Sequence, residues 1–180
     1  MELTRHHGAA VEQDPQGDIL IVRTATYSDD LSVNEVDNYG SEDPQDTTQI
    51  MFARSRDAGI SFDPVIRISD QGGDCLDDDN TVEGAVPCVD VDGNVYVVWA
   101  GPRGIEMDRS TDGGKTFGED RVIMDIPGCW TSEVQGIGRN NGMPVTRVDH
   151  TRGTYRDSNY VNWIDEPNDE KEVLMTLSRD

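Results

Sequence analysis

The chain has 180 residues, about the length of one domain, and 34% of them are hydrophobic, which is more than a disordered chain usually carries. Aspartate and glutamate number 36 against 15 lysines and arginines, which leaves a formal net charge of -21. A negative field of this size repels phosphate backbones and anionic lipid surfaces, and therefore argues against nucleic acid or membrane lipid as a partner.

The hydropathy pattern contains no membrane segment. No stretch approaches the roughly 20 apolar residues that are needed to cross a bilayer. The first residues, MELTRHHGAA, contain no apolar signal core before a small-residue cleavage site. The sequence therefore predicts a chain with no membrane span and no signal peptide.

One pattern of short strands occurs three times along the chain, starting at His7, Glu83 and near Asn140. Each copy opens with a small, apolar run that ends in aspartate, at 8–14, 84–90 and 142–149. A β-branched and aromatic run follows a polar turn, at 17–23, 93–99 and 158–163. A third run alternates apolar and polar residues, at 50–57, 105–112 and 173–180. Two copies continue into a fourth run, at 64–69 and 121–126.

Repeats of short antiparallel strands in sets of four are typical of β-propeller blades, so we predict an all-β propeller fold. The long irregular segments between strands are predicted to be loops, at 26–47, 70–82 and 127–141. A single domain would span 1–180, with blades at about 7–69, about 83–126 and, incomplete, about 140–180.

A Ser-x-Asp turn follows the third strand of every copy. In such a hairpin the aspartate can accept hydrogen bonds from turn amides, the glycine permits a positive φ, and the aromatic residue folds inward. We therefore expect these turns to be structural rather than catalytic. Their residues are Ser55, Asp57, Gly59 and Phe62 in the first copy, Ser110, Asp112, Gly114, Thr116 and Phe117 in the second, and Ser178 and Asp180 in the third.

The turns resemble the Asp boxes of BNR-repeat, sialidase-like β-propellers, and the string STDGGKTF matches the motif S-x-D-x-G-x-T-F/W at every defined position. The strings GAVPCVDVDGNVYVVWAGPRGIEMDRS and YVNWID are similar to bacterial secreted proteins of the exo-α-sialidase-like type. The resemblance implies a six-bladed propeller, an extracellular or periplasmic location, and a glycan or glycoconjugate ligand. The chain would supply about three blades, and the remaining blades of the full-length chain would be its partners.

Each blade of a propeller buries its two faces against neighbouring blades. A part of such a ring exposes two apolar faces that those neighbours would cover. We therefore expect the chain by itself to be marginally stable or prone to aggregation.

The innermost strand of each blade begins near the propeller axis, so the residues just before these strands converge on one pocket. These residues are His7, Glu83, and Asn140 or Asn141. Glu83 is the candidate catalytic residue, as a general acid, because it follows an acidic segment and precedes a small-residue run that lets backbones pack closely. The alternative is that these polar side chains only cap the ends of strands.

A second group of candidates precedes the third copy. Trp130 can stack on the face of a sugar ring, and Arg139 can bind a carboxylate through two parallel hydrogen bonds. With the residues above, they would form a substrate-binding edge; alternatively, Trp130 is a core aromatic. Trp99 and Trp163 occupy equivalent positions in their repeats, which indicates blade packing, whereas Arg23 at the same position of the first copy indicates an edge.

Sialidases of this fold use an arginine triad, a Tyr-Glu nucleophile pair and an aspartic acid/base, with the first arginine in an F/Y-R-I-P motif. No F-R-I-P string occurs here, and Arg67 in VIRIS follows a Ser-x-Asp turn, so it is not matched to that arginine. No tyrosine nucleophile can be assigned. The parent protein is therefore either a glycoside hydrolase, of which this chain alone is inactive, or a non-catalytic extracellular propeller that recognises glycans or proteins.

No cofactor is required by either hypothesis. The acidic segment that contains Asp77, Asp78 and Asp79 is either a solvated surface or a calcium site. Clustered carboxylates and carbonyls suit a hard cation, although no EF-hand spacing is present.

The three cysteines, Cys75, Cys88 and Cys129, have neither zinc-ribbon nor redox CxxC spacing. One interpretation is that they are buried or idle thiols. The other is a disulfide between Cys75 and Cys88 that closes an acidic loop, which would require an oxidising compartment.

Overall fold

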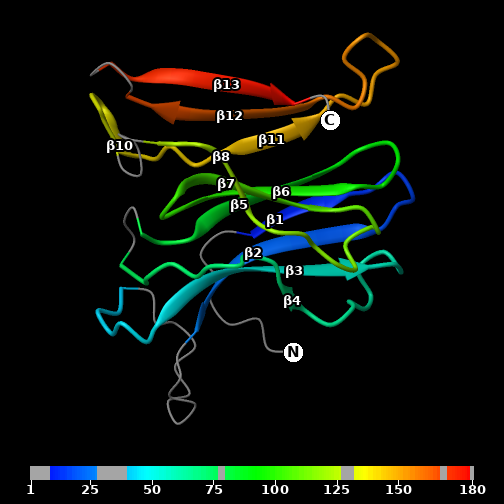
Figure 1. Cartoon of the computed structure of the whole chain (residues 1–180), viewed down its shortest axis with the longest axis horizontal. Helices are drawn as coiled ribbons and strands as arrows, with labels where there is room; N and C mark the ends of the chain where they lie inside the picture. Colours follow the sequence, from blue (N-terminus) through cyan, green and yellow to red (C-terminus); the bar gives the residue numbers. More distant parts are fainter. Residues whose placement is uncertain (1–8, 28–39, 77–79, 127–131, 167–169, 179–180) are drawn as a thin grey trace.

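The computed structural model describes residues 9–27, 40–76, 80–126, 132–166 and 170–178 (Figure 1). In these ranges the chain forms β-strands joined by turns and loops, without any helix. None of the described residues belongs to a helix that could span a membrane. The strands form three antiparallel sheets, one for each sequence repeat, and a separate small hairpin. The predicted all-β class is confirmed.

The strands of each sheet follow one another in chain order, as the repeats predicted. The first sheet contains β1 (Ala9–Gln13), β2 (Ile19–Tyr27), β3 (Thr47–Ser55) and β4 (Ile66–Arg67). The second contains β5 (Glu83–Val89), β6 (Val95–Gly101), β7 (Gly104–Ser110) and β8 (Arg121–Met124). The third contains β11 (Val145–Val148), β12 (Asn159–Asp165) and β13 (Glu172–Ser178).

The predicted loop at 127–141 is wrong in its second half, which forms a hairpin. Its strands are β9 (Ser132–Val134) and β10 (Ile137–Asn140), joined by a turn at Gly136, which has a φ of 87°. These strands are 3 and 4 residues long, too short to show the alternating pattern by which strands are recognised in a sequence.

The outer strand β4 is also shorter than the predicted 64–69, since only Ile66 and Arg67 pair with β3. Beyond Arg67 the backbone N of Ile68 still donates to the carbonyl of Ile50 (2.9 Å), but the return hydrogen bond goes to a side chain. The backbone N of Ile50 donates to Oγ of Ser69 (3.0 Å), so the chain stays beside β3 without extending the strand.

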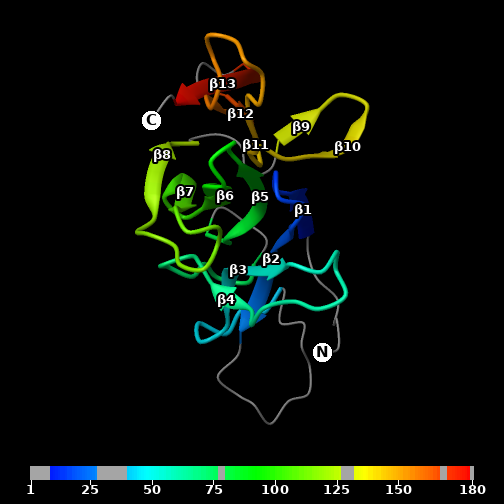
Figure 2. The same cartoon turned by 90° about the vertical axis from the view of Figure 1, so that its right-hand side faces the viewer.

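The three sheets stack in chain order, with the second between the first and the third (Figure 1). Their first strands, β1, β5 and β11, lie next to one another, and the other strands fan away from them (Figure 2). This arrangement is part of a propeller, in which each sheet is a blade and the inner strands face a common hub. We call the sheets blade 1, blade 2 and blade 3.

An apolar core fills each of the two spaces between blades. Trp99 of β6 is fully buried in the core between blades 1 and 2, and Trp163 of β12 is buried in the core between blades 2 and 3. The predicted packing role of both tryptophans is confirmed. Arg23 of β2 is half-buried, and it lies on the opposite face of blade 1 from the buried core residue Val22, because side chains alternate along a strand.

The Ser-x-Asp turn after β7 has the expected geometry. Asp112 accepts hydrogen bonds from the backbone N (2.9 Å) and Oγ1 (2.7 Å) of Thr116, which hold the pKa of its carboxyl well below the ordinary value. Gly114 has a φ of 83°, and a Cβ there would come within 2.6 Å of the Phe52 ring. Phe117 packs edge-on against Phe52 with 5.0 Å between ring centroids. Phe52 lies in β3 of blade 1 and Phe117 follows β7 of blade 2, so this turn packs blade 2 against blade 1.

The turn after β3 is built in the same way. Asp57 accepts hydrogen bonds from Oγ (2.6 Å) and the backbone N (2.8 Å) of Ser61, which lower its pKa to about 2. Phe62 is half-buried. In the third copy Ser178 ends β13, and Asp180 lies outside the described residues.

Candidate functional site

Glu83 is the first residue of β5 and stands at the end of blade 2 where the inner strands begin. Only 5% of its surface is exposed, and it pairs in register with Ala100 of β6. The register shifts between Glu83 and Val86, an irregularity of the kind that re-aims side chains beside functional sites. The sheet itself therefore positions Glu83.

The start of blade 3 meets the same edge. Gly84 has a φ of 71°, and a Cβ there would lie 2.8 Å from Sδ of Met143, so a side chain would collide. Met143 precedes β11, and its backbone N donates to Oδ1 of Asn141 (3.4 Å). The close approach of Gly84 and Met143 brings the segment that carries Asn141 near the start of β5. The convergence of these residues with His7 on one pocket stays a prediction.

The other residues predicted at this edge are only partly described. Asn140 is the last residue of β10 and is half-buried. Arg139 lies in the same strand, but its side chain is outside the described part. His7 and Trp130 lie outside the described residues altogether. The substrate-binding edge therefore stays a prediction.

The opposite end of the hub contains a cavity of about 240 Å³ that the sequence reasoning missed. Glu12, Cys88 and Arg147 line it, one each from β1, β5 and β11. Each stands two residues before the aspartate that ends the first run of its repeat. Because equivalent positions face the hub together, the repeat alignment contained the signal that finds them.

Polar groups at this end of the hub are matched with one another. Arg147 forms an ion pair with Glu12, which joins blade 3 to blade 1. His150 Nε2 donates to the carbonyl of Val89 (2.6 Å). Burial raises the pKa of the Cys88 thiol to about 12, so the thiol stays protonated and is a poor nucleophile at neutral pH. We conclude that these residues join the blades rather than perform chemistry.

The disulfide interpretation is wrong for the described cysteines, since Cys75 and Cys88 are both free and buried. Cys75 lies beside the start of β5, where Asp74 forms a bridge with Thr81, whereas Cys88 lies near the other end of that strand. Burial raises the pKa of the Cys75 thiol to about 11. Cys129 lies outside the described residues.

Four acidic residues approach one another between the outer parts of blades 1 and 2: Asp70, Glu106, Asp108 and Asp120. The backbone N of Asp70 donates to Oδ2 of Asp120 (2.7 Å), and the backbone N of Asp120 donates to Oδ2 of Asp70 (2.9 Å). Burial, together with the three neighbouring carboxylates, raises the pKa of Asp120 to about 6. Arg103 lies 3.6 Å from Asp120 and supplies a positive charge to the cluster.

The predicted calcium site at Asp77, Asp78 and Asp79 lies outside the described residues. Among the residues that are described, no three acidic, histidine or cysteine side chains are placed to hold one metal ion. Calcium binding by the acidic segment therefore stays a prediction.

Comparison with known proteins identifies the fold. A scan against protein-family models and a search of curated proteins each return no match. Among solved structures, the Hadza microbial sialidase Hz136 is similar, with a TM-score of 0.57 and 17% identity, covering 96% of this chain and 35% of the sialidase. The chain therefore has a sialidase-like fold, and it spans about a third of that sialidase.

Two further solved structures are more distant. A protein of unknown function from Dyadobacter fermentans has a TM-score of 0.46 and 14% identity, covering 93% of this chain and 52% of its own. A leech intramolecular trans-sialidase has a TM-score of 0.39 and 14% identity, covering 91% of this chain and 23% of its own.

Proposed function

We propose that this chain supplies three blades of a BNR-repeat, exo-α-sialidase-like propeller, and that its parent protein is an extracellular or periplasmic glycoside hydrolase. The observation that supports this proposal is the contact of Gly84 with Met143, which gathers the starts of two inner strands at one edge of the hub. The similar microbial structure is named a sialidase, in agreement with a glycan as the ligand.

In this proposal Glu83 is the general acid that protonates the leaving-group oxygen of the glycosidic bond. Trp130 stacks on the sugar, and Arg139 binds a carboxylate of the substrate. His7 and Asn141 contact the ring hydroxyls. The nucleophile comes from other blades, so this chain alone is inactive. No cofactor takes part in the reaction, and calcium at the acidic segment would be structural.

The second candidate is a non-catalytic propeller that recognises glycans or proteins. It is favoured by the ion pairing of one hub residue and the protonation of another, both at the end of the hub opposite Glu83. Arg147 is committed to its ion pair with Glu12, and Cys88 is a buried, protonated thiol. Neither residue therefore supplies an unpaired cation or a thiolate nucleophile at this end of the hub.

The deciding experiment uses the full-length protein that carries this chain, with Glu83→Gln as the variant and Glu42→Gln, an exposed position, as the control. Turnover is measured on a fluorogenic sialoside and on a panel of neutral glycosides, and binding is measured on a glycan array. For the hydrolase we expect Glu83→Gln to lower kcat by about 100-fold or more, because proton transfer contributes at least that much.

Wild-type binding without turnover on any glycoside would favour the recognition module. Unchanged turnover and unchanged glycan binding in Glu83→Gln would remove Glu83 from the site. Thermal unfolding of both variants checks that any loss reflects the site and not the fold.

A further inference from the structure

A second cavity, of about 340 Å³, lies between blades 2 and 3 at the end of blade 2 opposite Glu83. We call it the interblade pocket. Blade 2 contributes Tyr96, Arg109 and Arg121 to its wall, and blade 3 contributes Asn159. The pocket is therefore built from elements of two blades and is distinct from the hub edge.

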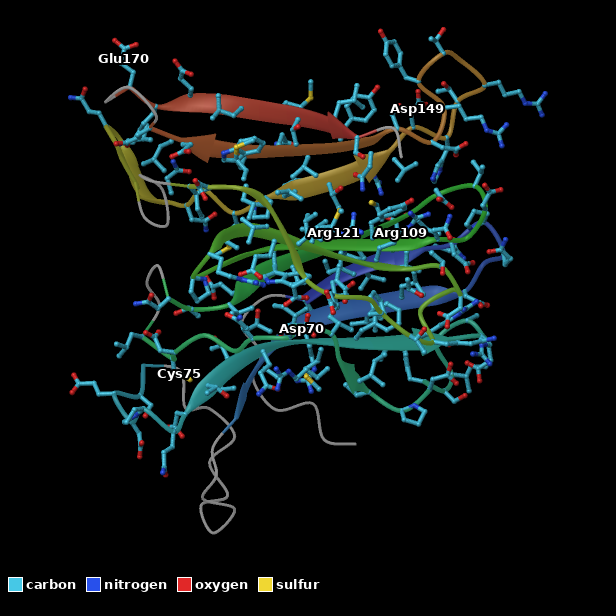
Figure 3. The ribbon with its side chains drawn as sticks, viewed as in Figure 1. Asp70, Cys75, Arg109, Arg121, Asp149 and Glu170 are labelled. Carbon is cyan, nitrogen blue, oxygen red and sulfur yellow. The ribbon has the colours of Figure 1, made fainter. Side chains whose placement is uncertain are left out.

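The two arginines share one face of blade 2. Arg121 pairs with Met107 across β7 and β8, and Met107 packs on the core that faces blade 3. Arg109 stands two residues further along β7, so it points to the same side, as a diagonal neighbour of Arg121 at about 7–8 Å between Cα atoms. Figure 3 shows Arg109 and Arg121 next to each other on blade 2.

A ring contact supports the side chain of Arg109. Its guanidinium lies over the Tyr96 ring, 5.2 Å from the ring centroid. The hydroxyl of Tyr96 donates to Oδ2 of Asp90 (3.2 Å), which fixes the ring. Stacking of this kind leaves the N–H groups at the rim of the guanidinium free to bind a ligand.

Neither arginine of the pocket forms an ion pair with a described carboxylate. This is unusual for a chain with 36 acidic residues and 15 basic ones. Elsewhere in the described structure Arg54, Arg103 and Arg147 are each bound to an acidic side chain. The two guanidinium groups of the pocket are thus not neutralised by an ion pair within the described structure.

We propose that the interblade pocket binds the oxyanion of a small acidic ligand, a carboxylate or a sulfate, between Arg109 and Arg121. Guanidinium groups bind such oxyanions through paired, charge-assisted hydrogen bonds. The exposed hydroxyl of Thr111 offers a further donor at the mouth of the pocket.

Two acidic residues, Asp108 and Glu119, also line the pocket. The Asp108 side chain belongs to the acidic cluster on the blade 1 side of β7, opposite to Met107 and Arg109. Its Oδ1 accepts from the N–H groups of Arg109 (2.6 Å) and Gly118 (2.9 Å). Glu119 is exposed, as Arg109 and Arg121 are, and no ion pair joins it to either arginine in the described structure. A ligand competes with Glu119 for the arginines, and contact with both guanidinium groups favours the ligand. The pocket goes beyond the proposed function, since it does not depend on what the hub binds.

The test titrates the chain with sodium glucuronate, sodium sulfate and glucose at constant ionic strength, following the Arg Nε–H resonances by NMR. We expect saturable shifts of Arg109 and Arg121 with glucuronate, with sulfate, or with both, and none with glucose. Shifts with sulfate alone would identify a small inorganic oxyanion as the ligand, whereas shifts with glucuronate would extend the ligand class to acidic sugars.

The variant Arg109→Gln/Arg121→Gln is expected to weaken binding by about tenfold or more, because it removes both charge-assisted pairs. Arg109→Lys/Arg121→Lys keeps the charge and loses the paired geometry, so it should weaken binding less; it replaces the first variant if that one fails to fold. Arg152→Gln/Arg156→Gln removes the same two charges at exposed positions outside the pocket. Shifts that do not saturate, or an equal loss in Arg152→Gln/Arg156→Gln, would overturn the proposal.

Discussion

Single residues show how burial and neighbouring charge change the acidity of a carboxyl group in this chain. Asp57 and Asp112 sit in turns that donate hydrogen bonds to them, and the pKa of each is lowered. Asp120 also accepts a backbone hydrogen bond, yet its pKa is raised to about 6, because burial and three neighbouring carboxylates outweigh that bond. The pKa of an aspartate in this chain is therefore lowered where turn hydrogen bonds dominate and raised where burial and neighbouring carboxylates dominate.

We predict that Asp120 makes the chain less stable as the pH rises from about 4 to about 6. In this range the folded state keeps a proton on Asp120, and the unfolded state, with an ordinary pKa of 3.8, has released it. Asp120→Asn removes this dependence. Relative to wild type, the variant should gain about 1 kcal/mol in the free energy of unfolding between these pH values, a figure that allows for solvent screening.

Urea unfolding at a series of pH values measures this difference. The control is Asp92→Asn, which makes the same change of charge at an exposed position. An Asp120→Asn profile parallel to that of wild type would show that the carboxyl is already ionised at pH 5.

The elements of the fold are held together mainly by the cores between blades. Trp99 lies in the middle strand β6, and 0% of its surface is exposed. It packs in one core with Leu20, Val22 and Phe52 of blade 1. Trp99 therefore lies in a strand of blade 2, and its side chain fills the core between blade 2 and blade 1.

We predict that Trp99→Ala lowers the free energy of unfolding by about 3–5 kcal/mol, because it leaves a large cavity between the blades. The measurement is urea unfolding followed by circular dichroism. Trp99→Phe keeps an aromatic ring in the same place and should cost clearly less. A loss below about 1 kcal/mol for the alanine variant would mean that the blades do not pack as described.

At the scale of the whole molecule, blade 3 carries an uncovered apolar face. Val173 is 73% exposed and Met175 is 66% exposed on β13, and Val145 is 50% exposed on β11. The neighbouring residue Leu174 packs on the core toward blade 2, so Val173 and Met175 face the other side. Asn162 lies between Val145 and Met175 in the sheet, and exposed apolar side chains gathered on one face of a folded protein favour association.

We predict that the chain self-associates through this face, and that raising the salt concentration strengthens the association by screening the charge of -21. Val173→Lys/Met175→Lys should shift the mass measured by light scattering toward the 19.9 kDa monomer. Val122→Lys, at a residue 43% exposed on the outer strand β8, is the control and should leave the mass unchanged. A wild-type chain that stays monomeric at high salt would contradict the prediction.

The sequence by itself determined most of the strands, their order within each repeat and the Ser-x-Asp turns. Alternation of apolar and polar residues marks a strand locally, and the Ser-x-Asp turn of Asp112 is made by residues within one hairpin. The equivalence of Trp99 and Trp163 followed from the repeats alone. The sequence did not predict the hairpin of β9 and β10, because its strands are too short to show an alternation of apolar and polar residues.

Only the tertiary structure decided which side chains meet across blades. The acidic residues around Asp120, the ion pair of Glu12 with Arg147, and the pair of arginines at the interblade pocket unite positions from different strands or different repeats. Their charges and acidities depend on distance and burial, which arise when the blades stack. No local pattern in the chain encodes those two quantities.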